Sequence, residues 1–145
     1  MTAYADTGFL CSLYAPDAHT PRAVKRMKRQ WLPLAWTWLH QLEMRNALRL
    51  RVFRREIGAR QRDACLNMVL ADLAAGVLIV ATPPLAEVTT EAERLSALHS
   101  ETLGTRTLDI LHVAAALVLG LTELLTFDTR QAALGRAVSL RVPAL

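Results

Sequence analysis

Four acidic residues occupy positions where carboxylates could meet one another instead of solvent. Asp6 and Asp128 each end a short apolar run typical of a β-strand, and Asp109 lies near the start of the most apolar helical pattern in the chain. Glu43 lies inside the apolar pattern of a long helix. Clustered carboxylates repel each other, and a hard divalent cation with oxygen ligands relieves that repulsion. The four acids therefore indicate a site for an ion such as Mg²⁺, which can polarise a phosphodiester and activate water.

The two acids at strand ends also have a simpler structural explanation. Asp6 or its neighbour Thr7 could cap the helix expected to follow. Asp128 opens the segment "DTRQ", in which Gln131 stands three residues on, as in a capping box. Each of these acids taken alone fits a structural role. Only their combination with the other two favours a metal site.

The two acids within helical patterns can be explained separately as well. If Thr107 is the N-cap of its helix, Asp109 occupies the first turn, where the helix dipole favours a negative charge. Glu43 could lie at the edge of its helix's apolar face and pair with an arginine of the neighbouring basic helix. A carboxylate that points at the core costs several kcal/mol unless a cation or donors meet it. The expected apolar stripe around Glu43 consists of Leu39, Leu42, Ala47, Leu50 and Phe53.

Strand and helix patterns alternate along the chain and predict an α/β fold. We expect one domain over residues 1–145, with a mostly parallel central sheet of four to five strands and helices on both faces. The expected strands span 2–6, 32–37, 77–82 and 123–128, with a possible fifth at 137–143. The expected helices span 7–15, 17–30, 38–55, 58–76, 85–104 and 107–120, and another follows Asp128.

The positions of strand ends connect this fold to the acids. The segment "VLIVAT" at 77–82 is expected to be the clearest buried strand, because it is apolar and β-branched and is followed by Pro83 and Pro84. Gly76 is expected to end the preceding helix. In parallel sheets, ligands bind beyond the carboxyl ends of the strands. Asp6 and Asp128 both stand at such ends.

The charge of the chain is distributed unevenly. The net charge is +4, yet residues 22–62 hold 12 of the 17 basic residues and only two acids. Arginine outnumbers lysine 15 to 2, and arginine suits bidentate contact with phosphate. This region predicts a polyanionic or acidic protein partner, although a solvated helix face accounts for the charge equally well.

Composition excludes several other classes of protein. An apolar fraction of 52% argues against disorder. The first ten residues lack the basic start of a signal peptide, and the longest apolar run, 113–121, is far shorter than the roughly 20 residues of a membrane span. We therefore expect a soluble protein of the cytoplasm. Cys11 and Cys65 form no CxxC pair and are expected to be buried thiols.

The histidines and tryptophans give weaker signals. The four histidines show no metal-binding spacing, but His112 lies one turn after Asp109 and could orient it. A packed core or supporting histidine is the favoured interpretation. Three tryptophans surround the second expected strand and predict core packing with a possible dimer surface: Trp31, Trp36 and Trp38.

Other acid-rich α/β enzymes fit this sequence less well. A haloacid-dehalogenase-type phosphatase needs a second Asp two residues after the first, and that position is Gly8. A response-regulator receiver needs a lysine after a late strand, whereas the lysines here are Lys25 and Lys28. The chain also lacks GxxxxGK[ST] and GxGxxG, the phosphate-binding motifs of nucleotide-binding proteins.

Four segments of the chain carry a family resemblance. In order they are "YADTGFLCSLY", "LHQLEMRNAL", "TRTLDILHVAAAL" and "LLTFDTRQAAL". They resemble the four acidic motifs of PIN-domain nucleases, and most closely those of the VapC toxins of bacterial toxin–antitoxin pairs. The resemblance covers essentially the whole chain. It assigns Asp6, Glu43, Asp109 and Asp128 to the metal site and Thr126 to a small hydroxyl position; Gly8 departs from it, because Ser or Asn is frequent there.

The resemblance implies a metal-dependent endoribonuclease that uses Mg²⁺ or Mn²⁺. Asp6 and Asp109 would contact the metal directly, and Glu43 and Asp128 would position the attacking water or a second ion. The resemblance also implies a homodimer and an antitoxin that blocks the site. The basic region would guide RNA or receive the antitoxin, with Arg49 and Arg51 as candidate contacts.

A different class of function remains open at this point. The protein could be a catalytically inactive module that binds RNA or a protein through residues 22–62. Nuclease activity should require a divalent metal and vanish in EDTA, whereas simple binding should not. The presence of all four acids favours the enzyme.

Overall fold

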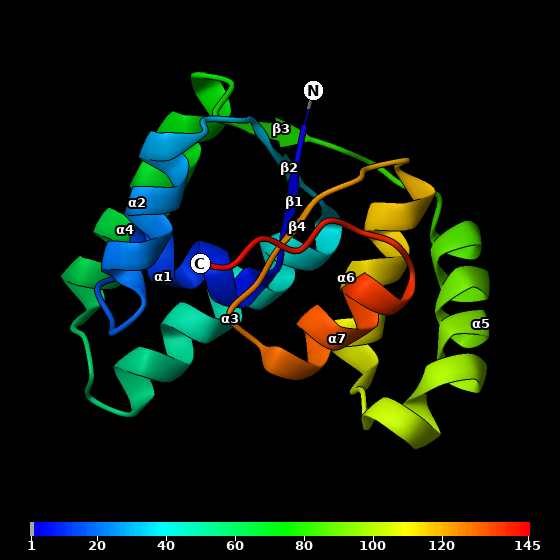
Figure 1. Cartoon of the computed structure of the whole chain (residues 1–145). Coiled ribbons are helices and arrows are strands. Elements are labelled where there is room, and N and C mark those ends of the chain that lie inside the picture. The colour runs from blue at the N-terminus through cyan, green and yellow to red at the C-terminus, as the bar shows by residue number, and fades with distance from the viewer. Residues whose placement is uncertain (1) are drawn as a thin grey trace.

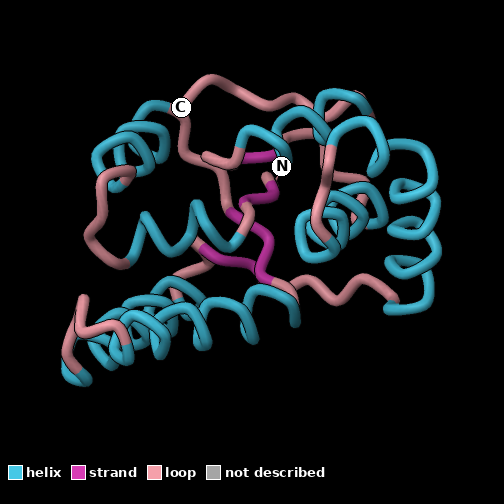
Figure 2. The backbone as a smooth tube through the Cα atoms, turned by 90° about the horizontal axis from the view of Figure 1, so that it is seen from below, coloured by secondary structure: helices cyan, strands magenta, loops and turns pink. Residues whose placement is uncertain are grey.

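Four short strands run parallel through the middle of the fold, and helices cover both of their faces (Figures 1 and 2). The computed structural model describes residues 2–145. Strand β1 (Tyr4–Ala5) pairs with β4 (Leu124–Leu125), and β2 (Leu34–Trp36) pairs with β3 (Leu78–Val80). A bridge between Ala3 and Leu34 joins the two pairs, so the strands follow the order β3-β2-β1-β4. The predicted mixed α/β architecture with a parallel centre is confirmed.

The helices form two groups on opposite sides of the strands. In Figure 1, α1 to α4 lie on one side and α5 to α7 on the other. Their bounds are α1 (Thr7–Tyr14), α2 (Thr20–Arg29), α3 (Trp38–Phe53), α4 (Ala59–Ala74), α5 (Leu85–Leu103), α6 (Thr107–Val118) and α7 (Thr129–Ala137).

Alternation along the strands produces two separate cores. Ala5 and Leu125 face the core with α1 to α4, whereas Tyr4 and Leu124 face the core with α5 to α7. Successive residues of a strand point to opposite faces, so even two-residue strands contribute to both cores. Strands β1, β2 and β4 are therefore buried on both faces, as expected for a parallel sheet between helices.

Two predictions about burial were wrong. Strand β3 is not the most buried strand: Ile79 is 43% and Val80 is 66% exposed, because β3 pairs with β2 at the edge of the described sheet. On α3, the predicted stripe faces the core only in part: Leu39 is buried, whereas Leu42 and Phe53 are 66% and 83% exposed. The buried side chains of α3 are Leu39, His40, Met44 and Leu48.

The structure also tests the predictions for the fifth strand, the cysteines and the tryptophans. The fifth strand predicted at 137–143 is a single bridge between Arg141 and Glu123. Cys11 and Cys65 are buried free thiols, as predicted. Trp36 is buried, but Trp31 and Trp38 are exposed. None of the helices within residues 2–145 is long and apolar enough to cross a membrane.

A buried ion network ties α2 to the sheet. Glu123, which precedes β4, is 3% exposed, and its two carboxylate oxygens accept bonds from Arg26 and Arg141. Arg26, on α2, is 9% exposed and also donates to the Gln30 carbonyl at 2.6 Å. One arginine of the basic region is thus committed to structure and is not available to a partner.

We predict that Glu123→Gln lowers the free energy of unfolding by about 3 kcal/mol, because it leaves the charge of Arg26 buried without its counter-ion. Denaturation in urea measures this change. Glu93→Gln is the matched control, since Glu93 is exposed on α5 and should change stability by less than about 0.5 kcal/mol. Equal changes in the free energy of unfolding for the two substitutions would show that the buried ion network does not stabilise the fold.

Candidate active site

Strands β1 and β4 deliver two acids to the same edge of the sheet. They are parallel neighbours, and Asp6 and Asp128 follow their carboxyl ends. Both acids cap helices: Asp6 Oδ1 accepts from the Phe9 N–H at 2.6 Å, and Asp128 Oδ1 accepts from the Arg130 and Gln131 N–H groups at 2.8 and 2.9 Å. Each acid uses one oxygen for its cap, so capping leaves the other oxygen for further contacts.

Thr126 links these two acids. Its hydroxyl donates to Asp6 Oδ2 at 2.5 Å and accepts from the Asp128 N–H at 3.0 Å. The expected capping box at Asp128 is therefore only half formed, since Thr126 takes the place that Gln131 would have had as acceptor. Thr126 is 6% exposed. Its contacts are those of a residue that holds the two acids; the expected contact with substrate stays a prediction.

Asp109 joins this group through Arg106. Arg106 is the N-cap of α6, where Thr107 was predicted, and Asp109 lies in the first turn as expected. Arg106 Nε donates to Asp109 Oδ2 at 3.1 Å, and a terminal nitrogen of the same guanidinium donates to Asp128 Oδ2 at 3.3 Å. A cation supplied by the chain itself thus already bridges two of the four acids.

Glu43 approaches the site from α3 and is held by two side chains. Thr7, the residue after Asp6, donates to Glu43 Oε2 at 2.8 Å. His112 Nε2 lies 2.5 Å from the same oxygen, and its Nδ1 lies 2.8 Å from the Tyr4 hydroxyl. The arginine partner considered for Glu43 is not found among the described residues. His112 contacts Glu43 and not Asp109, the residue that it was expected to orient.

The surroundings shift the pKa values of Asp6 and Glu43 in opposite directions. Burial raises the pKa of Asp6. The bonds from Thr126 and Phe9 and the charge of His112 offset this only in part, and the nearby charge of Asp109 raises the pKa further. Burial also acts to raise the pKa of Glu43, but the bond and charge of His112 and the bond from Thr7 outweigh it, so the net shift is downward. The surroundings therefore disfavour the charged form of Asp6 and favour that of Glu43.

The donor set suits a small hard cation in its chemistry. Asp6, Asp109 and Asp128 offer carboxylate oxygens, the ligands that Mg²⁺ prefers. A Cβ added at Gly8 would lie 3.4 Å from Asp6 Oδ1, so glycine leaves the approach to this carboxylate open. As the side chains stand in residues 2–145, no three His, Cys, Asp or Glu residues are close enough together to hold a metal ion. Arg106 must release its two carboxylates before they can close on an ion.

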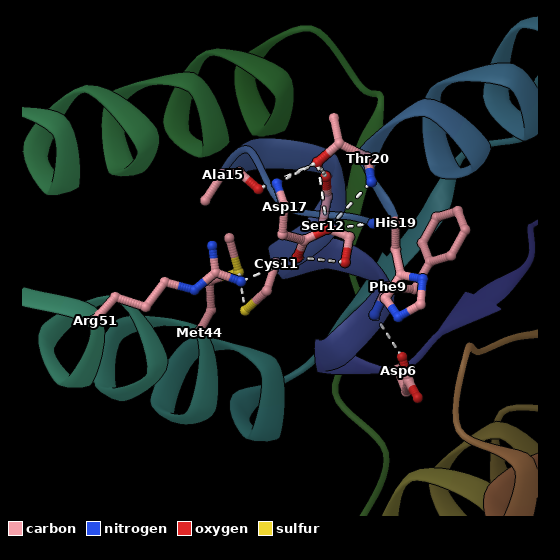
Figure 3. Close-up of polar contacts among 10 residues, drawn as sticks. All are labelled: Asp6, Phe9, Cys11, Ser12, Ala15, Asp17, His19, Thr20, Met44 and Arg51. Carbon is pink, nitrogen blue, oxygen red and sulfur yellow. Dashed lines mark hydrogen bonds and ion pairs between the residues drawn. The ribbon is translucent and has the colours of Figure 1, made fainter. Parts of the chain in front are cut away.

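A cavity of about 530 Å³ begins at Glu43 and extends between α1 and α3. Thr7 and Glu43 lie at its end nearest the acids, and Asp17, Arg51 and Arg54 line its other parts. Arg51 donates to Asp17 at 3.1 Å (Figure 3). Arg49, the other predicted arginine contact, is exposed on α3 and does not line this cavity. Within the basic region 22–62, Arg51 and Arg54 thus line the cavity, whereas Arg26 of α2 is buried in its ion network.

The sequence analysis missed two residues of this site and assigned a third to the wrong partner. Arg106 and Thr7 each adjoin a motif acid along the chain, yet nothing in the pattern distinguishes them from ordinary helix-start residues. His112 was recognised as a supporting histidine, but its partner was assigned to its own helix. Its true partner Glu43 is 69 positions away, and only the packing of α6 against β1 and α3 brings them together.

We predict that His112→Phe raises the pKa of Glu43, because Glu43 loses the bond that contributes most to lowering it. The same change leaves the buried Tyr4 hydroxyl without its acceptor, which should cost roughly 1–3 kcal/mol of stability. Carboxyl chemical shifts of ¹³C-labelled glutamate, followed over a pH series, measure the first effect. Tyr4→Phe is the control, since it preserves the contact between His112 and Glu43; a Glu43 pKa unaltered in His112→Phe would contradict the assignment.

Comparison with known proteins supports the fold. No protein-family model and no curated protein sequence matches the chain. Nine chains of solved structures do, among them the following two. VapC20 of Mycobacterium tuberculosis, a toxin that cleaves the sarcin–ricin loop, has 22% identity and a TM-score of 0.68 over 93% of this chain and 95% of that one. FitAcB of Neisseria gonorrhoeae has 16% identity and a TM-score of 0.62 over 99% and 97%. The chain therefore has the PIN-like α/β fold of VapC-type structures over nearly its whole length, as its four motifs predicted.

Proposed function

We propose that this protein is a metal-dependent endoribonuclease of the VapC type, which cleaves RNA phosphodiester bonds as the toxin of a toxin–antitoxin pair. One observation carries the proposal: at the carboxyl edge of β1 and β4, Thr126 and Arg106 join Asp6, Asp128 and Asp109, and Glu43 is bonded to Thr7, the residue after Asp6. The fold shared with VapC20, a toxin that cleaves the sarcin–ricin loop, supports the same function.

In this proposal each acid has a role that follows from its surroundings. Asp6 and Asp109 would hold the divalent ion, because the charged form of Asp6 is disfavoured by its burial and the charge of Asp109 acts on the same carboxyl group. Glu43 and Asp128 complete the site from either side and orient the attacking water or a second ion. When bound, Mg²⁺ or Mn²⁺ polarises the phosphodiester and makes that water more acidic.

The chain's own residues prepare this arrangement. Thr126 and the Phe9 N–H hold the carboxylate of Asp6 in one orientation, and Thr7 and His112 do so for Glu43. Fixing these groups before the substrate arrives lowers the entropy cost of reaching the reactive geometry. The basic region supplies Arg49 and Arg51 for contact with RNA phosphates or with acidic groups of an antitoxin.

The partners belong to the proposal as well. A cognate antitoxin would block the site, and a second copy of the chain would form a homodimer in the cytoplasm. Trp38, Leu42 and Phe53 on α3 are exposed by 41%, 66% and 83%. Large apolar side chains exposed along one helix are the kind of surface that a protein partner covers.

We predict that Asp109→Asn abolishes RNA cleavage while it preserves the fold, because it removes one negative charge without changing the side chain's shape. Cleavage of RNA with Mg²⁺ and a thermal melt measure the two effects. Glu101→Gln, an exposed change of the same chemistry on α5, is the control and should cleave like the parent. Full activity in Asp109→Asn would remove Asp109 from the metal site.

We also predict that Mg²⁺ or Mn²⁺ raises the melting temperature. An ion that binds only the folded state adds about 2.7 kcal/mol of stability at 100 times its dissociation constant. Asp6→Asn should stabilise the metal-free protein near neutral pH, since the raised pKa of Asp6 means that its charge opposes folding there. The same variant should shrink the increment produced by metal. The metal-binding role of the acids would be contradicted if millimolar Mn²⁺ left the melting temperature unchanged and RNA cleavage persisted in EDTA.

A further inference from the structure

The cavity that begins at Glu43 is large enough for more than a metal ion. Its volume of about 530 Å³ lies within the range of sites that bind small organic groups. It shares Thr7 and Glu43 with the acids, so a group bound in it would lie directly beside them. A second cavity, of about 320 Å³ between α3 and α4, touches none of the four acids.

One wall of this cavity is a loop whose conformation is fixed by Asp17. The Asp17 carboxylate accepts from the Ser12 hydroxyl at 2.8 Å, from the N–H groups of His19 and Thr20 at 2.8 and 3.1 Å, and from Arg51 at 3.1 Å (Figure 3). These bonds join α1, the loop after it and α3. The wall is therefore held in place before any ligand binds.

The same loop is anchored to the segment that carries Asp128. The ring of His19 stacks on Phe127 with centroids 4.5 Å apart, and Phe127 stacks on Phe9 at 5.5 Å. The Arg22 guanidinium lies 4.9 Å from the centre of the Phe127 ring. Because Phe127 stands between Thr126 and Asp128, the cavity wall and the acids form one connected unit.

The charge of the lining differs between the part of the cavity at Glu43 and the part at Arg51 and Arg54. Arg51 and Arg54 line it three positions apart on α3, which places their side chains on the same face of the helix. The side chain of Arg51 is 18% exposed and is oriented by Asp17. Guanidinium groups held in this way suit phosphate, to which they donate in pairs. One end of the cavity thus suits a metal ion and the other suits a phosphate.

The rest of the lining combines apolar side chains with one amide and with the polar side chains of Ser12 and His19. Leu50 and Leu108 line the cavity and are 39% and 49% exposed, and Ala47 lies beside them. Exposed apolar side chains facing a cavity suit the face of a nucleobase better than a sugar or a phosphate. Asn46, also in the lining and exposed, carries both a donor and an acceptor that could read the edge of a base.

We propose that this cavity binds one unpaired nucleotide of the RNA, next to the phosphodiester that is cleaved. Its base lies against Leu50 and Leu108, its edge meets Asn46, and its distal phosphate meets Arg51 and Arg54. A base in a duplex cannot reach such a cavity without leaving its stack, so the site selects single-stranded segments. The inference rests on the proposed function, but it concerns binding and not cleavage.

The test measures binding without metal. Fluorescent single-stranded hexanucleotides of A, C, G or U, and a duplex of matched length, are titrated in EDTA against the Asp109→Asn protein. Ala47→Leu, which fills the cavity, should weaken single-strand binding by at least about tenfold, the worth of one lost base contact. Asn46→Ala should reduce the differences among the four hexanucleotides. Arg54→Ala should weaken binding, and Arg94→Ala, which changes an exposed arginine on α5 outside both the cavity and the basic region, should match the parent.

Two results would overturn the proposal. One is parental affinity in an Ala47→Leu protein that keeps the parent's melting curve and its Mn²⁺ increment. The other is a duplex bound as tightly as the single strand. If Ala47→Leu does not fold, Leu108→Glu on the exposed side of the cavity replaces it, with the same expected loss. A chain that binds single strands through this cavity but cleaves none with Mn²⁺ would support the subsite and reject the nuclease function, so the two failures are distinguishable.

Discussion

The buried carboxyl group of Asp6 connects the central strands to the first helix. The carboxylate of Asp6 is 5% exposed and lies where β1 ends and α1 begins. Burial makes the charged form of this carboxyl group costly. The hydrogen bonds donated by the Phe9 N–H and the Thr126 hydroxyl offset part of that cost. The Thr126 bond requires β4 beside β1, and the Phe9 bond requires α1 to begin at once. The order of the central strands and the direction of the first helix are therefore both tied to this one group.

Helix capping and metal binding are compatible uses of the same acid. In both Asp6 and Asp128, one oxygen accepts from the first turn of a helix, while the second oxygen faces a neighbouring side chain. The cap fixes the carboxylate's orientation, which a ligand to an ion also needs. Arg106 meanwhile compensates Asp109 and Asp128 from the solvent side. Because Arg106 is exposed and its two bonds are long, it can leave more cheaply than a buried partner could.

The sequence predicted the fold class because its signals are local. Apolar runs alternate with helical patterns, and prolines, glycines and capping acids mark the boundaries, so the parallel centre and its helices could be expected. Burial was predicted less well. The run at 77–82 is β-branched and apolar, yet Ile79 and Val80 are exposed, since strand position in the sheet is not encoded in the run itself. The apolar residues of α3 likewise divide between the core and an exposed surface, a division that depends on where α1 and α4 pack.

The sequence alone determined which acids are unusual, because residue type and position relative to strand and helix ends can be read along the chain. Only the tertiary structure decided what each acid touches. Glu43 meets His112, and Asp6 meets Thr126 at a separation of 120 residues. Arg51 faces the cavity, whereas Arg49, two positions away on the same helix, does not. Contacts across such separations depend on the packing of whole helices and strands against each other, and no local pattern of residues specifies that packing.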